Sequence, residues 1–163
     1  LGLVDRIRNR MPDIALSTDI IVGFPGETEE DFEQTLSLAE TVRYAQAYTF
    51  IYSKRAGTPA AEIDDPTPHE VILERFSRLV KVIETTAHEY TQGELHTVVP
   101  ALIEGTSKKN DAVLLGKSPK NQTVHAPIPE GYSIDQLVGK IVDVDVDVAK
   151  TWYLSGSVVG EPR

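Results

Sequence analysis

The sequence predicts an α/β part followed by an all-β part, and two patterns lead to that prediction. Within residues 15–53, an apolar run, an amphipathic segment and a run of aromatic and β-branched residues follow one another. A strand, a helix and a strand in that order are typical of a right-handed parallel unit. After Gly93 the chain changes to short alternating runs separated by Gly, Asn, Lys and Pro clusters. Five short strands of this kind predict a small closed β-barrel.

Composition narrows the class of protein. The chain has 163 residues, of which 40% are hydrophobic, enough for one or two domains with real cores. It has no cysteine, which excludes disulfides, a cysteine nucleophile and any metal or cluster held by thiolates of this chain. No apolar run approaches the ~20 residues of a membrane span, so we expect a cytoplasmic protein with no membrane partner.

Charge is unevenly distributed along the chain. The net charge of −9 argues against nucleic-acid binding for the molecule as a whole. The stretch 105–126, however, sets four lysines against a single aspartate: Lys108, Lys109, Lys117 and Lys120 against Asp111. A local basic patch of this kind can bind phosphates although the whole chain is acidic.

The first residues predict the end of a helix. Val4, Ile7 and Met11 are spaced for one helix face, and Pro12 stops the helix. The chain begins without a methionine and without a helix cap. We therefore expect residues 1–10 to be the tail of a longer helix, and the chain to be a piece of a larger protein.

The stretch from Thr18 to Thr28 is the feature around which the first part is organised. Its apolar run is typical of a strand covered on both faces, and Gly23 and Gly26 permit a tight turn. Neither glycine motif of the phosphate-binding loops is present. Carboxylates crowd the helix start: Glu27, Glu29, Glu30 and Asp31. Thr28 and Asp31 also resemble a capping box, with Asp in place of Glu or Gln, which predicts that the helix begins here. Because these carboxylates would repel a phosphate, a ligand here needs hydroxyls or positive charge. A turn without any ligand fits the same spacing.

A polar loop follows the second strand and lies on the same rim as that turn. Its Lys54 and Arg55 either pair with the acidic turn, hold an anionic ligand or stay solvated. Thr67, Pro68 and Glu70 then form the capping sequence of a long helix with one apolar face. The histidines near the ends of that helix are not spaced as metal ligands, and we expect no metal site.

In the all-β part, the expected strands cover residues 97–103, 112–115, 123–125, 141–148 and 152–159. In the fourth of them, valines alternate with Asp143, Asp145 and Asp147. This alternation predicts valines in the barrel core and an exposed acidic face that discourages edge pairing, with a cation site as the alternative.

Three segments together resemble the radical S-adenosylmethionine methylthiotransferases. They are Asp19-Ile-Ile-Val-Gly-Phe-Pro-Gly-Glu-Thr28, Tyr48-Thr-Phe-Ile-Tyr-Ser-Lys-Arg-Ala-Gly-Thr-Pro-Ala-Ala61 and Glu104-Gly-Thr-Ser-Lys-Lys109. The resemblance covers essentially the whole chain. It is greatest to the branch that modifies adenosine next to the tRNA anticodon, the 2-methylthio-N6-isopentenyladenosine synthases.

The resemblance implies a fold and an activity. Residues 1–91 would be the C-terminal portion of a radical-SAM, TIM-like partial α/β barrel, and residues 92–163 a five-stranded, RNA-binding TRAM β-barrel. The full-length protein would add a methylthio group to C2 of N6-isopentenyladenosine, using S-adenosylmethionine and [4Fe-4S] clusters whose cysteine ligands this chain lacks. The chain alone would be inactive. Its partners would be the tRNA anticodon stem-loop and the missing N-terminal part of the same protein. The alternatives are the sister branch that methylthiolates a ribosomal-protein aspartate, and a stand-alone RNA-binding module.

The resemblance also implies site residues. The S-adenosylmethionine pocket would be lined by Asp19, Ile21, Gly23, Gly26, Glu27, Tyr52 and Arg55. No catalytic residue is expected in this chain. The loop from Thr106 to Gln122 would bind RNA through Lys108, Lys109, Lys117, Lys120 and Asn121. Trp152 and Tyr153 are candidates for stacking on bases, and we expect one of the two to fill the core.

Overall fold

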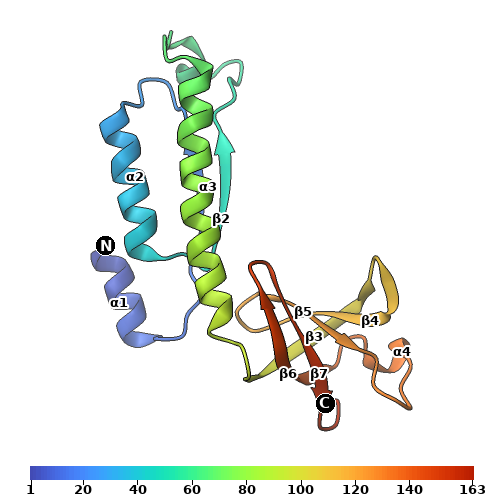
Figure 1. Cartoon of the computed structure of the whole chain (residues 1–163). Helices are drawn as coiled ribbons and strands as arrows, with labels where there is room; N and C mark the ends of the chain where they lie inside the picture. The colour runs from blue at the N-terminus through green and yellow to red at the C-terminus, as the bar shows by residue number, and fades with distance from the viewer. The chain divides into compact units, whose positions relative to one another are not determined.

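A computed structural model describes all residues of the chain, 1–163. The chain divides into two compact units, Leu1–Ala87 and His88–Arg163, and each unit has its own core. The elements in chain order (Figure 1) are α1 (Gly2–Arg10), β1 (Ser17–Val22), α2 (Glu29–Val42), β2 (Gln46–Ile51), the 3-10 helix η1 (Pro59–Glu62), α3 (His69–Gln92), β3 (Val98–Ser107), β4 (Asn110–Lys117), β5 (Thr123–Pro127), α4 (Ile134–Leu137), β6 (Ile141–Lys150) and β7 (Tyr153–Val159). The boundary expected between residues 91 and 92 stays a prediction.

The first unit is a strand–helix–strand unit, as predicted. β1 and β2 are parallel, with Ser17 opposite Gln46 and Val22 opposite Ile51. The helices α2 and α3 run alongside the strands (Figure 1). Their apolar residues pack with β1 in one core: Val22, Phe32, Leu36, Ala39, Leu79 and Ile83.

The other face of this two-stranded sheet is uncovered. Ile21, Tyr48 and Phe50 are 51%, 52% and 52% exposed. In the register of the sheet, Ile21 lies opposite Phe50, and Asp19 lies opposite Tyr48. The expectation that β1 is covered on both faces is therefore wrong for this chain. The reason is that α2 and α3 contribute to a single core on the same side of the sheet.

Capping residues set where the helices begin. The Thr28 N–H donates to Asp31 Oδ2 at 3.0 Å, and Thr28 Oγ1 accepts from the Asp31 N–H at 3.2 Å. This reciprocal pair is the predicted capping box of α2. The long helix α3 begins at His69, directly after Pro68. None of the helices has the length and apolar character needed to cross a membrane.

The second unit is a closed five-stranded barrel, as predicted. The strands follow the order β3-β4-β5-β7-β6, and only β5 and β7 pair in parallel. The short helix α4 lies between β5 and β6 in the chain, and its Leu137 is fully buried in the core. The sequence did not indicate α4, because four residues are too few to show a helical period.

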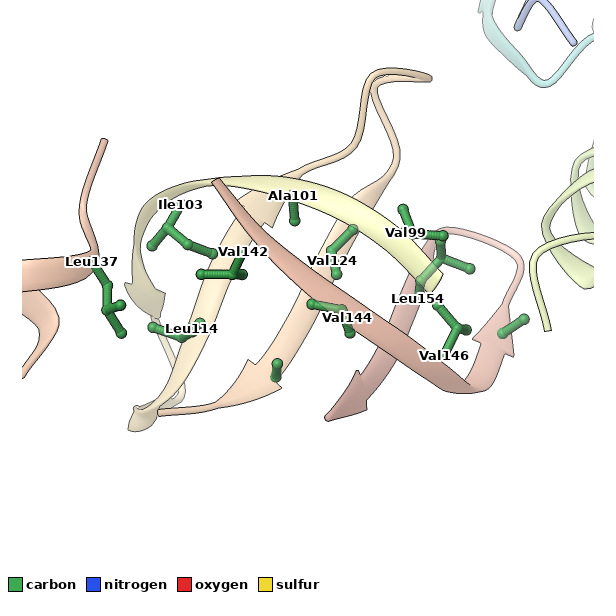
Figure 2. Packing of buried hydrophobic residues seen from close by; sticks show 12 residues of the cluster. Val99, Ala101, Ile103, Leu114, Val124, Leu137, Val142, Val144, Val146 and Leu154 are labelled. Atoms are coloured by element: carbon green, nitrogen blue, oxygen red, sulfur yellow. The ribbon is translucent and has the colours of Figure 1, made fainter. Parts of the chain in front are cut away.

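The barrel core follows the alternation of the strands. Val142, Val144 and Val146 of β6 are at most 1% exposed and point inward with Ile103 and Leu114 (Figure 2). The predicted valine core is thereby confirmed. Close packing of β6 against β7 leaves no room for a side chain at position 156, because a Cβ on Gly156 would lie 1.9 Å from the Asp145 carbonyl oxygen.

The carboxylates of β6 face outward. Asp145 and Asp147 are exposed, and Asp143 accepts a hydrogen bond from Arg163 Nη2 at 2.9 Å. That bond holds the pKa of Asp143 below its ordinary value. These aspartates therefore form a solvated outer surface, one member of which pairs with the last residue of the chain.

Candidate functional site

The turn between β1 and α2 is held against α3 by its first glycine. Gly23 and Gly26 have φ angles of 73° and 88°, which side-chain-bearing residues rarely adopt. A Cβ on Gly23 would lie 2.7 Å from Ile72 Cγ2 of α3. Glycine is therefore required here both by the backbone conformation and by close packing on α3.

The backbone amides of this turn are occupied by carboxylates of the same unit. The Gly23 N–H donates to Glu27 Oε2 at 2.9 Å, and the Gly26 N–H donates to Asp65 Oδ2 at 3.2 Å. The Thr28 N–H is taken by Asp31. A phosphate-binding loop instead directs such amides at the ligand. The structure thus agrees with the sequence argument that this turn does not bind phosphate.

A buried arginine of α3 supports the turn. Arg75 is 5% exposed; its Nε donates to Glu29 Oε2 at 2.9 Å, and its Nη1 donates to the Glu27 carbonyl oxygen at 3.0 Å. The Glu27 carboxylate also lies 3.4 Å from Nη1. Arg78 pairs with Glu29 as well, and hydrogen bonds from Arg78 and then Arg75 lower the pKa of the Glu29 carboxyl. Two guanidinium groups of α3 therefore pair with Glu27 and Glu29 of the acidic helix start.

The cations that pair with the turn lie in a different segment from the one expected from the sequence. The sequence offers Lys54 and Arg55 as possible partners of the acidic turn, but both side chains are exposed, and neither forms an ion pair. Arg75 could have been found from its spacing, because it lies three residues after Ile72 and four before Leu79 on the apolar side of α3.

Tyr52 carries the polar atom at this rim that lacks a partner. Its N–H donates to the Val22 carbonyl oxygen at 2.8 Å, so Tyr52 directly extends the parallel ladder. Its hydroxyl is buried and has no hydrogen-bond partner. The Phe24 ring meets the Tyr52 ring edge to face at 5.1 Å and is itself 46% exposed. An exposed aromatic ring beside an unpaired hydroxyl is suited to a ligand that is partly apolar and carries a polar atom.

The other residues expected in this pocket lie in two places. Asp19 and Ile21 belong to the uncovered face of the sheet, whereas Gly23, Gly26 and Glu27 form the turn. The Glu27 carboxylate accepts from Gly23 and contacts Arg75, so its contacts are internal. Arg55 follows β2 and accepts a hydrogen bond from Thr58 through its carbonyl oxygen. Their roles toward a ligand stay predictions.

The lysines of the second unit do not lie in one loop. The stretch from 106 to 122 contains β4, so the expectation of a single basic loop is wrong. Lys108 and Lys109 occupy the β3–β4 turn, whereas Lys117 is the last residue of β4. Eight residues of strand at ~3.4 Å each separate Lys109 from Lys117 by roughly 25 Å. The two ends of β4 therefore present separate basic groups.

Two of the expected RNA-binding residues have structural contacts in the β4–β5 turn. Lys120 Nζ donates to Glu94 Oε1 at 2.5 Å and lies 5.8 Å from the centre of the Tyr90 ring. Asn121 has a φ angle of 60°, a left-handed conformation that asparagine tolerates in turns. These contacts shape the turn, and contact of either residue with RNA stays a prediction.

Both candidate stacking residues are exposed. Trp152 is 50% exposed and Tyr153 is 39% exposed, and Leu154 fills the adjacent core position instead. The expectation that one of the two aromatics fills the core is therefore wrong. The Tyr153 ring meets the His125 ring edge to face at 5.5 Å. His125 was missed, although the alternation of β5 places it on the outer face opposite the buried Val124 and Ala126.

Comparisons with known proteins cover both units. The TRAM domain family matches residues 93–159. Over 160 residues, the chain is 48% identical to a tRNA-2-methylthio-N(6)-dimethylallyladenosine synthase of Acetivibrio thermocellus, covering 98% of this chain and 32% of the relative. It is 47% identical over 161 residues to the synthase of the same name from Geobacillus kaustophilus, covering 99% and 29%. For that of Staphylococcus aureus the identity is 45% over 164 residues, covering 99% and 30%.

The chain thus spans about a third of the length of the curated relatives that it matches. The similarity is continuous through both units, since nearly every residue of the chain is aligned. Residues 93–159 match the TRAM domain family, and nearly the whole chain is similar to a part of these tRNA-2-methylthio-N(6)-dimethylallyladenosine synthases.

Proposed function

We propose that this chain is part of an enzyme that adds a methylthio group to C2 of N6-isopentenyladenosine next to the tRNA anticodon. The observation that carries the proposal is the unbroken similarity of 45–48% to the synthases through both the α/β unit and the TRAM domain. The α/β unit contributes to the S-adenosylmethionine pocket of a radical-SAM barrel, and the TRAM domain contributes RNA contacts. Neither task requires a catalytic residue from this chain.

The rim of the first unit fits one side of a bound S-adenosylmethionine. The exposed rings of Phe24 and Phe50 and the side chain of Ile21 offer apolar contact to adenine. The buried Tyr52 hydroxyl offers a hydrogen bond that it lacks within the chain. Asp19, on the uncovered face, supplies a negative charge suited to a sulfonium. When bound, this cofactor supplies the methyl group and the radical chemistry of the reaction.

Glu27 and the two glycines act differently from these side chains. The Glu27 carboxylate accepts from the Gly23 N–H and contacts Arg75, and it therefore fixes the course of the turn. The fixed turn holds Phe24 beside Tyr52. We infer that Gly23, Gly26 and Glu27 shape the pocket, and that Arg55 contacts the ligand only through its exposed side chain at the same rim.

The residues of this chain do not fit an iron–sulfur cluster. Cluster iron is normally held by cysteine thiolates, and the sequence has none. The cluster ligands of the proposed enzyme therefore belong to the part of the relatives' length that this chain does not span. The same part is the proposed partner of the uncovered sheet face that carries Ile21, Tyr48 and Phe50.

The test is to express the full-length protein in a bacterium that lacks its own methylthiotransferases. Mass spectrometry of tRNA nucleosides should then detect 2-methylthio-N6-isopentenyladenosine. A protein that consists only of the present 163 residues should leave N6-isopentenyladenosine unmodified. Methylthiolation of a ribosomal-protein aspartate with unmodified tRNA would instead assign the sister branch. Binding of RNA without either product would assign a stand-alone RNA-binding module.

A further inference from the structure

One row of side chains crosses the outside of the barrel at a single level. Residues that are Cα partners on neighbouring strands point to the same side of the sheet. Through four successive pairings, the register links Lys150, Tyr153, Thr123, Lys117 and Leu102. Their chain neighbours Leu154, Val124 and Gly116 are buried, so this row faces outward.

A second outward row lies directly beside the first. It consists of Val148, Ser155, His125 and Leu115, which are again successive Cα partners. His125 of this row and Tyr153 of the first row meet edge to face, with an interplanar angle of 87°. Tyr153 nevertheless keeps 39% of its surface exposed. The pair therefore presents an aromatic surface to solvent, held in place by two hydrogen-bonded strands. We call these two rows the β4–β5–β7 face.

The charge of this face contrasts with that of the chain. Its two rows contain Lys117 and Lys150 and no carboxylate, although the chain carries a net charge of −9. Lys117 Nζ donates one hydrogen bond, to Thr123 Oγ1 at 3.0 Å. An ammonium group has three N–H donors, so two remain for an anion such as a phosphate.

An apolar pocket lies on the other side of Lys117 from Tyr153. Its volume is about 250 Å³, and it is lined by Pro100, Leu102, Lys117, Ser118, Pro119 and Ile141. Neighbouring strands are ~4.8 Å apart, so two strand spacings put Tyr153 roughly 10 Å from Lys117. Along the first row, an aromatic surface, a cation and an apolar pocket follow one another.

We propose that the β4–β5–β7 face binds a short unpaired stretch of RNA. One base stacks on Tyr153 beside His125, the linking phosphate meets Lys117, and the adjacent base enters the pocket at Leu102 and Ile141. Splayed bases on aromatic and apolar side chains, with a cation at the backbone, are how proteins bind single-stranded RNA. The inference rests on the proposed function only in that the RNA is the tRNA substrate, whose unpaired bases lie in its loops.

This face is separate from the turn that carries Lys108 and Lys109. That turn lies at the opposite end of β4, roughly 25 Å away by strand length. The turn offers charge without aromatic side chains, so it can contact the backbone of paired or unpaired RNA alike. The β4–β5–β7 face instead requires exposed bases. The two surfaces therefore predict different preferences between duplex and single-stranded RNA.

The experiment measures binding of the 163-residue chain to a fluorescent single-stranded oligoribonucleotide of about six nucleotides and to a duplex of the same sequence. The variants are Tyr153→Ala, Tyr153→Phe, Lys117→Ala and, as a matched control at an exposed lysine of the first unit, Lys81→Ala. Tyr153→Ala should raise the Kd for the single strand about 5- to 150-fold, the range for one lost stacked base. Tyr153→Phe should bind as the parent chain does. Lys117→Ala should reduce the slope of log K against log salt by about 0.7, and Lys81→Ala should not.

Three results of the binding measurements would overturn the inference. These are equal affinity of Tyr153→Ala and the parent chain, equal or tighter binding of the duplex, and no RNA binding by the parent chain. Crosslinking of the parent chain to a photoreactive oligonucleotide tests the inference without any variant. Crosslinks on β5 and β7 would support the inference, and crosslinks confined to the Lys108–Lys109 turn would contradict it. Any of these failures leaves the nucleoside assay on the full-length protein to decide the proposed function independently.

Discussion

The two units differ in how completely they bury their apolar side chains. The second unit closes its sheet, so every strand has two partners and the apolar side chains of all five point into one core. The first unit has two strands with helices on one face, and it leaves Ile21, Tyr48 and Phe50 half exposed on the other. In the second unit, closure of the barrel leaves no sheet edge and completes the hydrophobic core within the chain itself. In the first unit, the exposed apolar face of the open sheet can be buried only by another surface.

The largest expected effect of this difference is on self-association. A protein of residues 88–163 should be a monomer with dispersed amide signals, whereas residues 1–87 should associate through the uncovered face. In the 163-residue chain, Phe50→Lys should shift the sedimentation profile toward monomer, because it places a charge in the middle of that face. Val159→Lys, at a half-exposed position of the barrel, is the matched control and should change nothing. A monomeric fragment 1–87 would contradict this view of the open sheet.

The next effect concerns what stabilises the first unit in place of closure. Arg75→Ala leaves the mostly buried carboxylate of Glu27 without its cation, and should lower the free energy of unfolding by about 3 kcal/mol. Arg78→Ala removes more exposed pairs with Glu29 and Glu33 and should cost less than about 1 kcal/mol. Urea unfolding followed by circular dichroism measures both. If both variants lowered the free energy of unfolding equally, the burial of Arg75 would not increase its contribution to stability.

A smaller expected effect is a difference between the two units in how their stability depends on pH. Hydrogen bonds to charged partners or to Thr side chains lower the pKa values of Glu29, Asp31 and Asp65 in the first unit, but only that of Asp143 among the carboxyls of the second. A lowered pKa in the folded state stabilises the protein above the unfolded pKa, and this contribution is lost as the pH falls through the folded value.

The first unit should therefore lose more stability than the second as the pH falls below the ordinary values of 4.5 for Glu29 and 3.8 for Asp31. Unfolding of the second unit can be followed by the single tryptophan, Trp152, and unfolding of the whole chain by circular dichroism. Glu29→Gln should flatten the acid dependence of the circular dichroism signal. If, as the pH falls, the transition seen by tryptophan is destabilised before the transition seen by circular dichroism, the assignment of acid sensitivity to the turn is wrong.

The sequence was informative wherever a local pattern determines structure. The alternation in β6 predicted an inward valine row, and Thr28 with Asp31 predicted the start of α2. Contacts between distant segments were not predictable in the same way. Arg75 and Glu27 are 48 residues apart, and the meeting of His125 with Tyr153 depends on the parallel pairing of β5 and β7. The positions of the lysines in the sequence likewise did not show that β4 separates them into two groups.

The smallest effect distinguishes the two basic groups of the barrel. The Lys108→Ala/Lys109→Ala variant removes exposed charges from the β3–β4 turn and leaves the β4–β5–β7 face intact. Lysines of this kind neutralise backbone phosphates, so affinity for an anticodon stem-loop should fall without a change in sequence preference. Each lost contact should reduce the slope of log K against log salt by about 0.7–0.9. Titrations at several salt concentrations measure this slope. An unchanged slope would assign the turn to ordinary solvated surface, and the barrel would then bind RNA through Lys117 and its aromatic neighbours alone.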